Sequence, residues 1–357
     1  MNTLGNLFRI SIFGESHGDC IGCTIDGLPA GFEPEWTLVN DELKLRMPRK
    51  SYESTSRYEA DSYKIISGYY NGHCSGMPLT VLFPNLDARS KDYNNLARPC
   101  HADFAANKKF HGYNDIRGGG AFSGRLTVAL VFAGSLAKQL LNKYGIKLAS
   151  HVQQIGHAVD SCFDPIMRDF PPLDRYFPLI DSSAKSDFEA ELTNARNDGD
   201  SIGAIVEAAA LNLPIGLGEP FFDSLESCMA HILFSIPGVR GIEFGKGFEI
   251  AASRGSEIND QFMLGGKTST NFSGGINGGL SNGMPLIFRI CFRPIPSISI
   301  AQSLLNTQTG AIVLHKIQGR HDACIVPRGC VIIEACAAIA IYDLLLRFKL
   351  NGGCGDD

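Results

Sequence analysis

Apolar residues recur at helical spacing in two long segments of the chain, 126–141 and 331–346. The first segment is followed by Gly145, a residue type that commonly ends helices. The second follows Pro327 and is apolar on nearly every face. A helix that is apolar all round must be buried inside the protein. The pattern therefore predicts two helices that are largely buried.

Alternating or β-branched stretches predict strands at 7–13, 202–208, 285–292 and 311–315. The predicted helices fall between groups of strands, without the regular strand–helix–strand order of a parallel sheet. The expected fold class is therefore α+β. Residues 1–350 contain no segment with the length and polar bias of an interdomain linker, so we expect a single domain followed by a flexible tail at 351–357.

The composition is that of a globular protein, with 357 residues of which 44% are hydrophobic and 19% charged. A net charge of −5 provides no basic surface for nucleic acid phosphates, which argues against a nucleic acid partner. Arg9 interrupts the N-terminal segment where a signal peptide needs apolar residues, and Glu334 and Asp343 interrupt the most apolar stretch. We therefore expect a cytoplasmic protein that does not span a membrane.

The eleven cysteines are odd in number and scattered along the chain, which predicts neither a disulfide framework nor a zinc site. Cys20 and Cys23 form one C-x-x-C pair without a second pair. We interpret them as small apolar side chains of the core and expect no metal site.

The segment FGESHG at 13–18 fits the G-x-S-x-G pattern of serine hydrolases at Ser16. That chemistry requires a helix directly after the serine, whereas the next residues include Gly22, Gly27 and Pro29, which break helical register. The pattern instead predicts a turn and a second strand, with His17 as the functional side chain. The hydrolase is the alternative, which a fluorophosphonate probe would test by labelling Ser16.

Two further polar segments contain ionisable clusters. In ARPCHAD, His101 lies between Arg98 and Asp103, and in GRHDACIVPR, Asp322 lies between two arginines. A solvated loop with local salt bridges is an equally simple interpretation of each cluster.

A run of three glycines at 118–120 leads toward the predicted helix, with Arg117 and Arg125 on either side. Backbone amides at a helix N-terminus favour an anion, so the segment suggests a phosphate site. It matches neither a Walker loop nor a Rossmann turn, and GGKT at 265–268 lacks the earlier glycine of the Walker pattern. The clusters together predict a site for a polyanionic metabolite in which histidines transfer protons.

Five motifs, in this order, resemble those of chorismate synthases: FGESHG at 13–18, RPCHAD at 98–103, DIRGGGAFSGR at 115–125, GGINGGLSNGMP at 274–285 and GRHDACIVPR at 319–328. The resemblance covers nearly the whole chain. It implies a lyase of the shikimate pathway of aromatic amino acid biosynthesis, which eliminates phosphate from 5-enolpyruvylshikimate 3-phosphate in an anti 1,4 sense to give chorismate. It also implies reduced FMN as cofactor, with no net oxidation, and a homotetramer whose subunit is a sandwich of helices between antiparallel β-sheets.

The resemblance assigns roles to individual residues. His17 donates a proton to the departing phosphate, His101 keeps the reduced flavin protonated, and Asp322 accepts the substrate proton through flavin N5. The arginines that bind the substrate are Arg46, Arg98, Arg125 and Arg320. The flavin contacts are Ser123, Pro237, Gly238, Gly278, Arg293, Pro294, Ile295, Pro296, Ser297 and Arg320. The resemblance leaves open whether NADPH or an external reductase reduces the flavin.

The chain departs from the family pattern at two positions that affect these expectations. A second substrate arginine of the family falls near Tyr52, and Arg49 is our candidate for the missing charge, with Lys50 as the alternative. Cys100 stands where the family has glycine, beside His101, which predicts sensitivity to oxidation. A flavin- or metabolite-binding protein that has lost the chemistry is a rival, but binding alone would not require all three proton-transfer residues.

Overall fold

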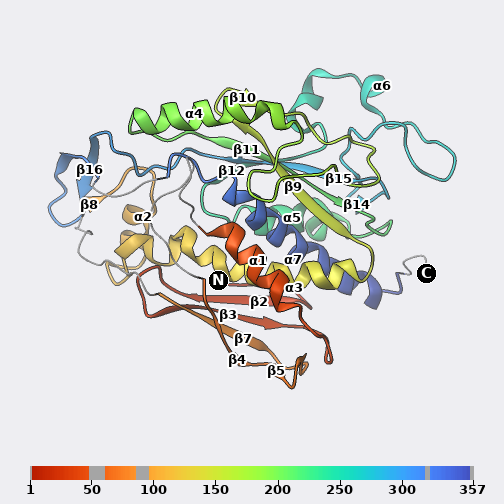
Figure 1. Cartoon of the computed structure of the whole chain (residues 1–357), viewed down its shortest axis with the longest axis horizontal. Helices are drawn as coiled ribbons and strands as arrows, with labels where there is room; N and C mark the ends of the chain where they lie inside the picture. Colours follow the sequence, from red (N-terminus) through yellow and green to blue (C-terminus); the bar gives the residue numbers. More distant parts are fainter. Residues whose placement is uncertain (1, 48–60, 86–95, 318–321, 354–357) are drawn as a thin grey trace.

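The computed structural model describes residues 2–47, 61–85, 96–317 and 322–353. Over these residues it contains two antiparallel sheets of five strands each (Figure 1). In spatial order, the first consists of β1 (Thr3–Leu4), β2 (Arg9–Gly14), β3 (Cys20–Asp26), β7 (Leu79–Pro84) and β4 (Lys64–Ser67). The second consists of β10 (Ala158–Val159), β9 (Lys147–Ile155), β11 (Ala204–Leu211), β15 (Leu286–Phe292) and β12 (Val239–Phe244).

The remaining described strands form small sheets: β8 (Leu96–Ala97) with β16 (Gln302–Asn306) and β17 (Ile312–His315), β5 (Tyr69–Tyr70) with β6 (His73–Cys74), and β13 (Ile276–Asn277) with β14 (Leu280–Ser281). The α-helices are α1 (Trp36–Arg46), α2 (Asp103–Lys109), α3 (Thr127–Asn142), α4 (Lys185–Asn197), α5 (Leu225–Leu233), α6 (Gly255–Ile258) and α7 (Arg328–Leu350). The 3₁₀ turns are η2 (Arg117–Phe122), η3 (Gly124–Leu126), η4 (Ser182–Ala184), η5 (Phe221–Asp223) and η6 (Gly247–Ala252).

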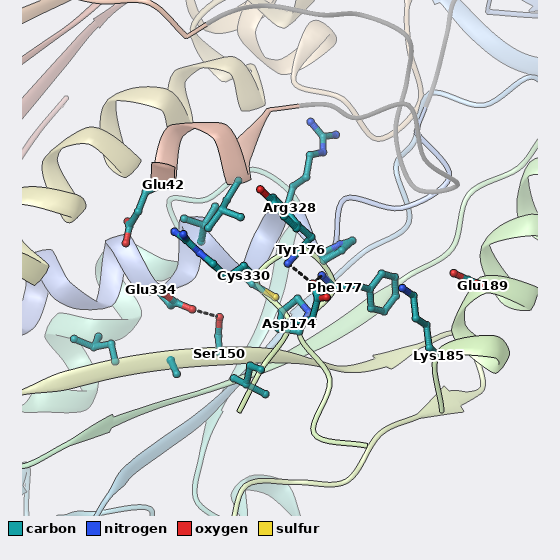
Figure 2. A pocket seen from close by; sticks show the side chains of 18 residues that line it. Glu42, Ser150, Asp174, Tyr176, Phe177, Lys185, Glu189, Arg328, Cys330 and Glu334 are labelled. Atoms are coloured by element: carbon teal, nitrogen blue, oxygen red, sulfur yellow. Dashed lines mark hydrogen bonds between the residues drawn. The ribbon is translucent and has the colours of Figure 1, made fainter. Parts of the chain in front are cut away.

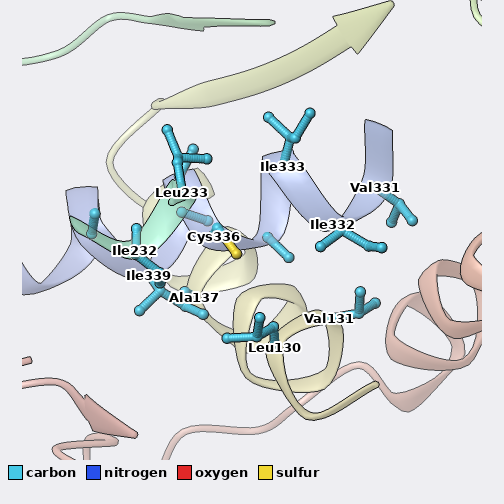
Figure 3. Close-up of a cluster of buried hydrophobic side chains, with 14 of the residues drawn as sticks. Leu130, Val131, Ala137, Ile232, Leu233, Val331, Ile332, Ile333, Cys336 and Ile339 are labelled. Atoms are coloured by element: carbon cyan, nitrogen blue, oxygen red, sulfur yellow. The ribbon is translucent and has the colours of Figure 1, made fainter. Parts of the chain in front are cut away.

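Helices α1, α3 and α7 lie between the two larger sheets, and α4 lies on the outer side of the second sheet (Figure 1). Helices α3 and α7 pack against each other in the core, where Val131 points toward Val331 and Ile332 (Figure 3). The backbones approach closely, because a Cβ at Gly134 would lie 2.4 Å from the Cα of Ala335. Gly134 is therefore required by packing, since a larger residue would push the helices apart.

The elements predicted from the sequence are confirmed, with ends shifted by a few residues. The predicted helices correspond to α3 and to the middle of α7, and the predicted strands correspond to β2, β11, β15 and β17. The α+β fold class is also borne out. The first residues of the predicted tail close the end of α7, where the N–H of Gly353 donates to the carbonyl of Phe348 at 2.9 Å. Residues 354–357 lie outside the described residues.

Helix α7 is, among the described residues, the one helix long and apolar enough by composition to cross a membrane, yet 89% of its most apolar window is buried inside the protein. The two acidic residues that interrupt it have structural partners. Asp343 accepts hydrogen bonds from the backbone N–H groups of residues 6–8 at 2.7 to 3.1 Å. Asp343 thereby ties the N-terminal segment to the central helix.

Glu334, the other acidic residue of α7, belongs to a group that we call the core cluster: Glu42, Lys138 and Glu334. The ammonium of Lys138 donates to Glu42 of α1 at 2.8 Å and to Glu334 at 2.6 Å. Glu334 also accepts from the hydroxyl of Ser150 at 2.7 Å (Figure 2). The core cluster therefore links α1, α3, α7 and β9 through charge-assisted hydrogen bonds.

The cysteines of the described residues are free thiols. Cys23 of the C-x-x-C pair is fully buried on β3, and burial raises the pKa of its thiol to about 12. This agrees with the interpretation of Cys23 as a core side chain, because a buried protonated thiol is a poor nucleophile.

Candidate active site

His17 lies in the turn between β2 and β3, and its side chain is buried. The chain after this turn is a strand, because β3 pairs antiparallel with β2, from Ile21 opposite Gly14 to Asp26 opposite Arg9. The side-chain amide of Asn85 holds the turn by donating to the carbonyls of Glu15 at 3.0 Å and Gly18 at 2.8 Å. The predicted hairpin is therefore confirmed, and the helix that a serine nucleophile would need after Ser16 is not formed.

The three glycines at 118–120 pack directly on the His17 turn. All three have positive φ, and a Cβ at Gly118 would lie 2.2 Å from the His17 ring. The N–H of Ser16 donates to the carbonyl of Gly120 at 3.1 Å. Only glycine combines this backbone conformation with such a close approach. The glycine run therefore forms the surface against which the His17 ring packs, and we call it the glycine bed.

The glycine run also reaches two other predicted site residues. A Cβ at Gly119 would have the guanidinium of Arg98 at 4.0 Å and the Cβ of Ser123 at 3.9 Å. Between the glycines and α3 lies the short turn η3, in which the N–H of Arg125 donates to the hydroxyl of Ser123 at 3.3 Å. The run still brings His17, Arg98 and Ser123 next to one stretch of backbone, which is partly buried at Gly118 and Gly119.

His101 is fixed at both ring nitrogens. Its Nδ1–H donates to the carbonyl of Pro99 at 3.0 Å, so in the neutral ring Nε2 accepts from the hydroxyl of Ser297 at 2.9 Å. Burial, and then the positive charge of Arg98, hold the pKa of His101 below its ordinary value. An anion beside the ring would raise this pKa again, because it would stabilise the imidazolium.

The same contacts join the segment 98–103 to the predicted flavin segment 293–297. Besides the bond between His101 and Ser297, the guanidinium of Arg293 donates to the carbonyl of Cys100 at 3.2 Å. Cys100 is exposed and has a φ of +59°, a conformation that favours glycine. The backbone thus explains why the family pattern has glycine at this position.

Arg98 forms a two-pronged pair with Asp103, from Nε at 2.7 Å and from Nη2 at 3.0 Å. The local salt bridge expected from the sequence is therefore present. The pair is mostly buried, with 16% and 14% of the two side chains exposed, so it holds Arg98 in one orientation beside the glycines.

Arg46 and Arg125, which come from α1 and η3, meet at a single carboxylate. Oδ2 of Asp61 accepts from Nε of Arg46 at 2.9 Å, and Oδ1 accepts from Nη1 of Arg125 at 2.5 Å. The exposed fractions of the side chains are 7% for each arginine and 1% for Asp61. We call Arg46, Asp61 and Arg125 the site cluster.

Asp322 is mostly buried just before α7, and its carboxylate accepts a hydrogen bond from Nη2 of Arg328. Arg328 also lines a cavity of about 560 Å³ beside the N-terminus of α7, together with Glu42, Arg175 and Glu334 (Figure 2). His17, His101 and Asp322 are not among the residues that line this cavity. Arg328 therefore contacts Asp322 and also borders this cavity.

The other predicted flavin residues are divided between two places. The carbonyl of Gly238, which follows Pro237, accepts from the N–H of Arg293 at 2.9 Å, so this loop adjoins the segment 293–297. Gly278 lies in the turn between β13 and β14, at the opposite end of the molecule from α2 (Figure 1). The structure does not bring Gly278 to the other site residues of this chain. Arg49, Lys50, Tyr52 and Arg320 lie outside the described residues.

Two residues of the site were missed in the sequence. Asp61 and Asn85 occur in polar segments without a periodic pattern, where any Asp or Asn reads as a surface residue. Their partners lie 15 to 70 positions away along the chain. Only covariation between these positions in related sequences would have indicated them.

Comparison with known proteins identifies the family. The model of the family described as "Chorismate synthase" matches residues 8–346. The chain belongs to this family. A chorismate synthase from Dehalococcoides mccartyi is 42% identical over 354 residues, covering 97% of each chain, and one from Thermococcus gammatolerans is 43% identical over 351 residues, covering 97% of this chain and 98% of the relative.

The fold agrees with that assignment. A solved structure, titled "Crystal Structure of Chorismate Synthase", superposes with a TM-score of 0.74 at 26% identity, over 96% of this chain and 93% of the other. The family that the five motifs indicate is thus the family that the whole chain matches.

Proposed function

We propose that this chain catalyses the chorismate synthase reaction, the anti 1,4-elimination of phosphate from 5-enolpyruvylshikimate 3-phosphate, and that His17, His101 and Asp322 are its proton-transfer residues. Membership of the family makes the chain a lyase of the shikimate pathway. The observation that carries the residue assignment is the glycine bed, which holds His17 beside Arg98 and Ser123.

His17 is the proton donor to the leaving phosphate. The glycine bed and the Asn85 hydrogen bonds keep its ring in one position, which is what proton transfer requires. The neighbouring arginines, Arg98 and Arg125, neutralise charge on the substrate and on the departing phosphate. Asp322 is the acceptor of the substrate proton, and Arg328 keeps that carboxylate oriented.

The residues around the glycine bed fit reduced FMN, the cofactor that the family implies. Among the described residues, a Cβ at Gly124 would have no atom within 4 Å and one at Gly119 would meet only Arg98 and Ser123, so this part of the backbone leaves room for a flat anionic molecule. Ser123, Arg293 and Ser297 would hold it, with Pro237, Gly238 and the intervening residues 294–296. When bound, reduced FMN supplies an electron-rich ring that assists loss of the phosphate. As an imidazolium, the form that a bound anion favours, His101 carries a second proton at Nε2, where its partner is the hydroxyl of Ser297.

The remaining properties of the family are part of the same proposal. We expect a single catalytic domain over 1–350, a sandwich of helices between antiparallel sheets, a homotetramer and a cytoplasmic location. Arg49 and Arg320 are expected to bind the substrate. Gly278 is expected to contact FMN, and because it lies far from the other site residues of its own chain, the FMN that it contacts would be bound to another subunit of the tetramer. NADPH and an external reductase remain the two candidate reductants, which an anaerobic assay comparing NADPH with dithionite separates.

The proposal is tested by turnover of variants with dithionite-reduced FMN under anaerobic conditions. His17→Ala should lower kcat by about 10² to 10⁴, the usual contribution of a positioned acid, while the free energy of unfolding stays unchanged. His73→Ala is the matched control, because His73 is exposed on β6, where its ring contacts the exposed Glu33 and the backbone carbonyl of Asn71. A His17→Ala enzyme that turns over at the wild-type rate would remove His17 from the reaction.

Asp322→Asn should bind the substrate and FMN but turn over slowly, because the amide is nearly isosteric and cannot accept the proton. Asp26→Asn, at an exposed pair with Arg9, is the control. A raised KM with unchanged kcat would make Asp322 a binding residue instead.

A further inference from the structure

Asp61 is the contact through which the two buried arginines of the site cluster meet. Each of its oxygens serves a different arginine, Oδ2 for Arg46 and Oδ1 for Arg125, and its side chain is 1% exposed. Arg46 donates through both Nε and Nη2, so one whole edge of its guanidinium is held. A planar guanidinium held along one edge has a fixed orientation.

Without a carboxylate between them, two buried guanidinium groups would repel each other and would separate. The arginines come from different elements, α1 and η3, so nothing in their local backbone keeps them together. Burial lowers the pKa of Arg46, and the charge of Asp61 opposes that change, while Arg125 and Arg328 add to it. Asp61 thus balances part of a local excess of positive charge.

We propose that Asp61 is a positioning residue for the substrate, which holds Arg46 and Arg125 at one spacing so that both can bind the same polyanion. The inference rests on the proposed substrate roles of these two arginines. Within these three residues there is one more cation than anion, a balance that favours an anionic ligand. Asp61 acts through the arginines and takes no proton from the substrate.

Loss of Asp61 has two opposing effects on binding. Removing a negative charge strengthens the attraction for any anion, whereas releasing the arginines destroys the spacing that recognises a particular one. A small symmetric anion feels mainly the first effect, and the larger substrate, with charges at several fixed points, feels mainly the second. The two ligands should therefore respond differently to the same substitution.

The experiment titrates FMN-loaded Asp61→Asn with the substrate and with inorganic phosphate. We expect the Kd of the substrate to rise at least tenfold and that of phosphate to fall or stay unchanged, with the KM for the substrate changing more than kcat. Asp61→Glu should recover part of the affinity. Asp61→Ala should recover part of it in sodium formate but not in sodium chloride of equal ionic strength, because formate can place a carboxylate between the arginines.

Two results would overturn the inference. One is a wild-type Kd for the substrate in Asp61→Asn, and the other is an equal, more than tenfold weakening of both ligands, which would mean that the site had collapsed. Arg46→Lys and Arg125→Lys separate this from the proposed function. If the two lysine variants weaken substrate binding while Asp61→Asn does not, only the positioning role of Asp61 fails. If both lysine variants bind the substrate with wild-type affinity, the arginines themselves do not bind it.

Discussion

The core cluster and the site cluster begin one helical turn apart on α1, at Glu42 and Arg46, but they have opposite compositions. The core cluster places one ammonium between two carboxylates, and the site cluster places one carboxylate between two guanidinium groups. Both are largely buried, and both join elements distant in sequence. They differ in which charge is in excess.

The difference matters because a carboxylate can remove its own excess charge and an arginine cannot. Burial raises the pKa of Glu42, which favours its neutral form and relieves the core cluster without any ligand. A guanidinium keeps its proton in proteins, so the site cluster retains its positive charge. The charges of the core cluster are balanced within the chain, whereas in our proposal the anionic substrate balances those of the site cluster.

Breaking the core cluster should have the largest effect on stability. Lys138→Met leaves Glu42 and Glu334 without their shared cation, and we expect the free energy of unfolding to fall by about 3–5 kcal/mol. Turnover per folded molecule should be nearly unchanged. Urea unfolding at neutral pH measures this, with Lys147→Met as the control, because Lys147 pairs with Asp169 at an exposed position. Equal stability of Lys138→Met and wild type would contradict the comparison.

Breaking the site cluster should affect activity instead of stability. Arg125→Met leaves Asp61 paired with Arg46, a balanced pair, so unfolding should change by less than about 1.5 kcal/mol. The kcat/KM for the substrate should fall by about 10² or more, the effect of leaving a buried ligand charge unpaired. Paired unfolding and turnover assays test this. An Arg125→Met variant that lost stability but kept its turnover would mean that the site cluster, like the core cluster, serves stability and not substrate binding.

The smallest effect sharpens the comparison through pH. Because the pKa of Glu42 is higher in the folded protein than its ordinary 4.5, protonation favours the folded state. That contribution is complete below the ordinary value and is lost as the pH rises through the folded value. The stability of wild type relative to Glu42→Gln should therefore fall as the pH rises from 4 to 8. A difference that stays constant over this pH range would contradict the prediction.

Much of the site was predictable because the residues that carry it are close in sequence. His17 with its turn, His101 with Arg98 and Asp103, and the glycine run each occupy a short segment with its own composition. The resemblance of those segments to one family was sufficient to identify it. Asp61 and Asn85 were not predictable, since each acts on residues brought beside it by folding.

The sequence alone determined the positions of the main helices and strands, the hairpin that carries His17 and the membership of the family, because these depend on periodicity, turn residues and local motifs. Only the tertiary structure decided that Glu334 and Asp343 are bonding groups within an apolar helix, and that Arg46 and Arg125 share Asp61. The physical reason is that the cost of burying a charge depends on its partners. Those partners come from segments whose proximity is set by packing and not by local pattern.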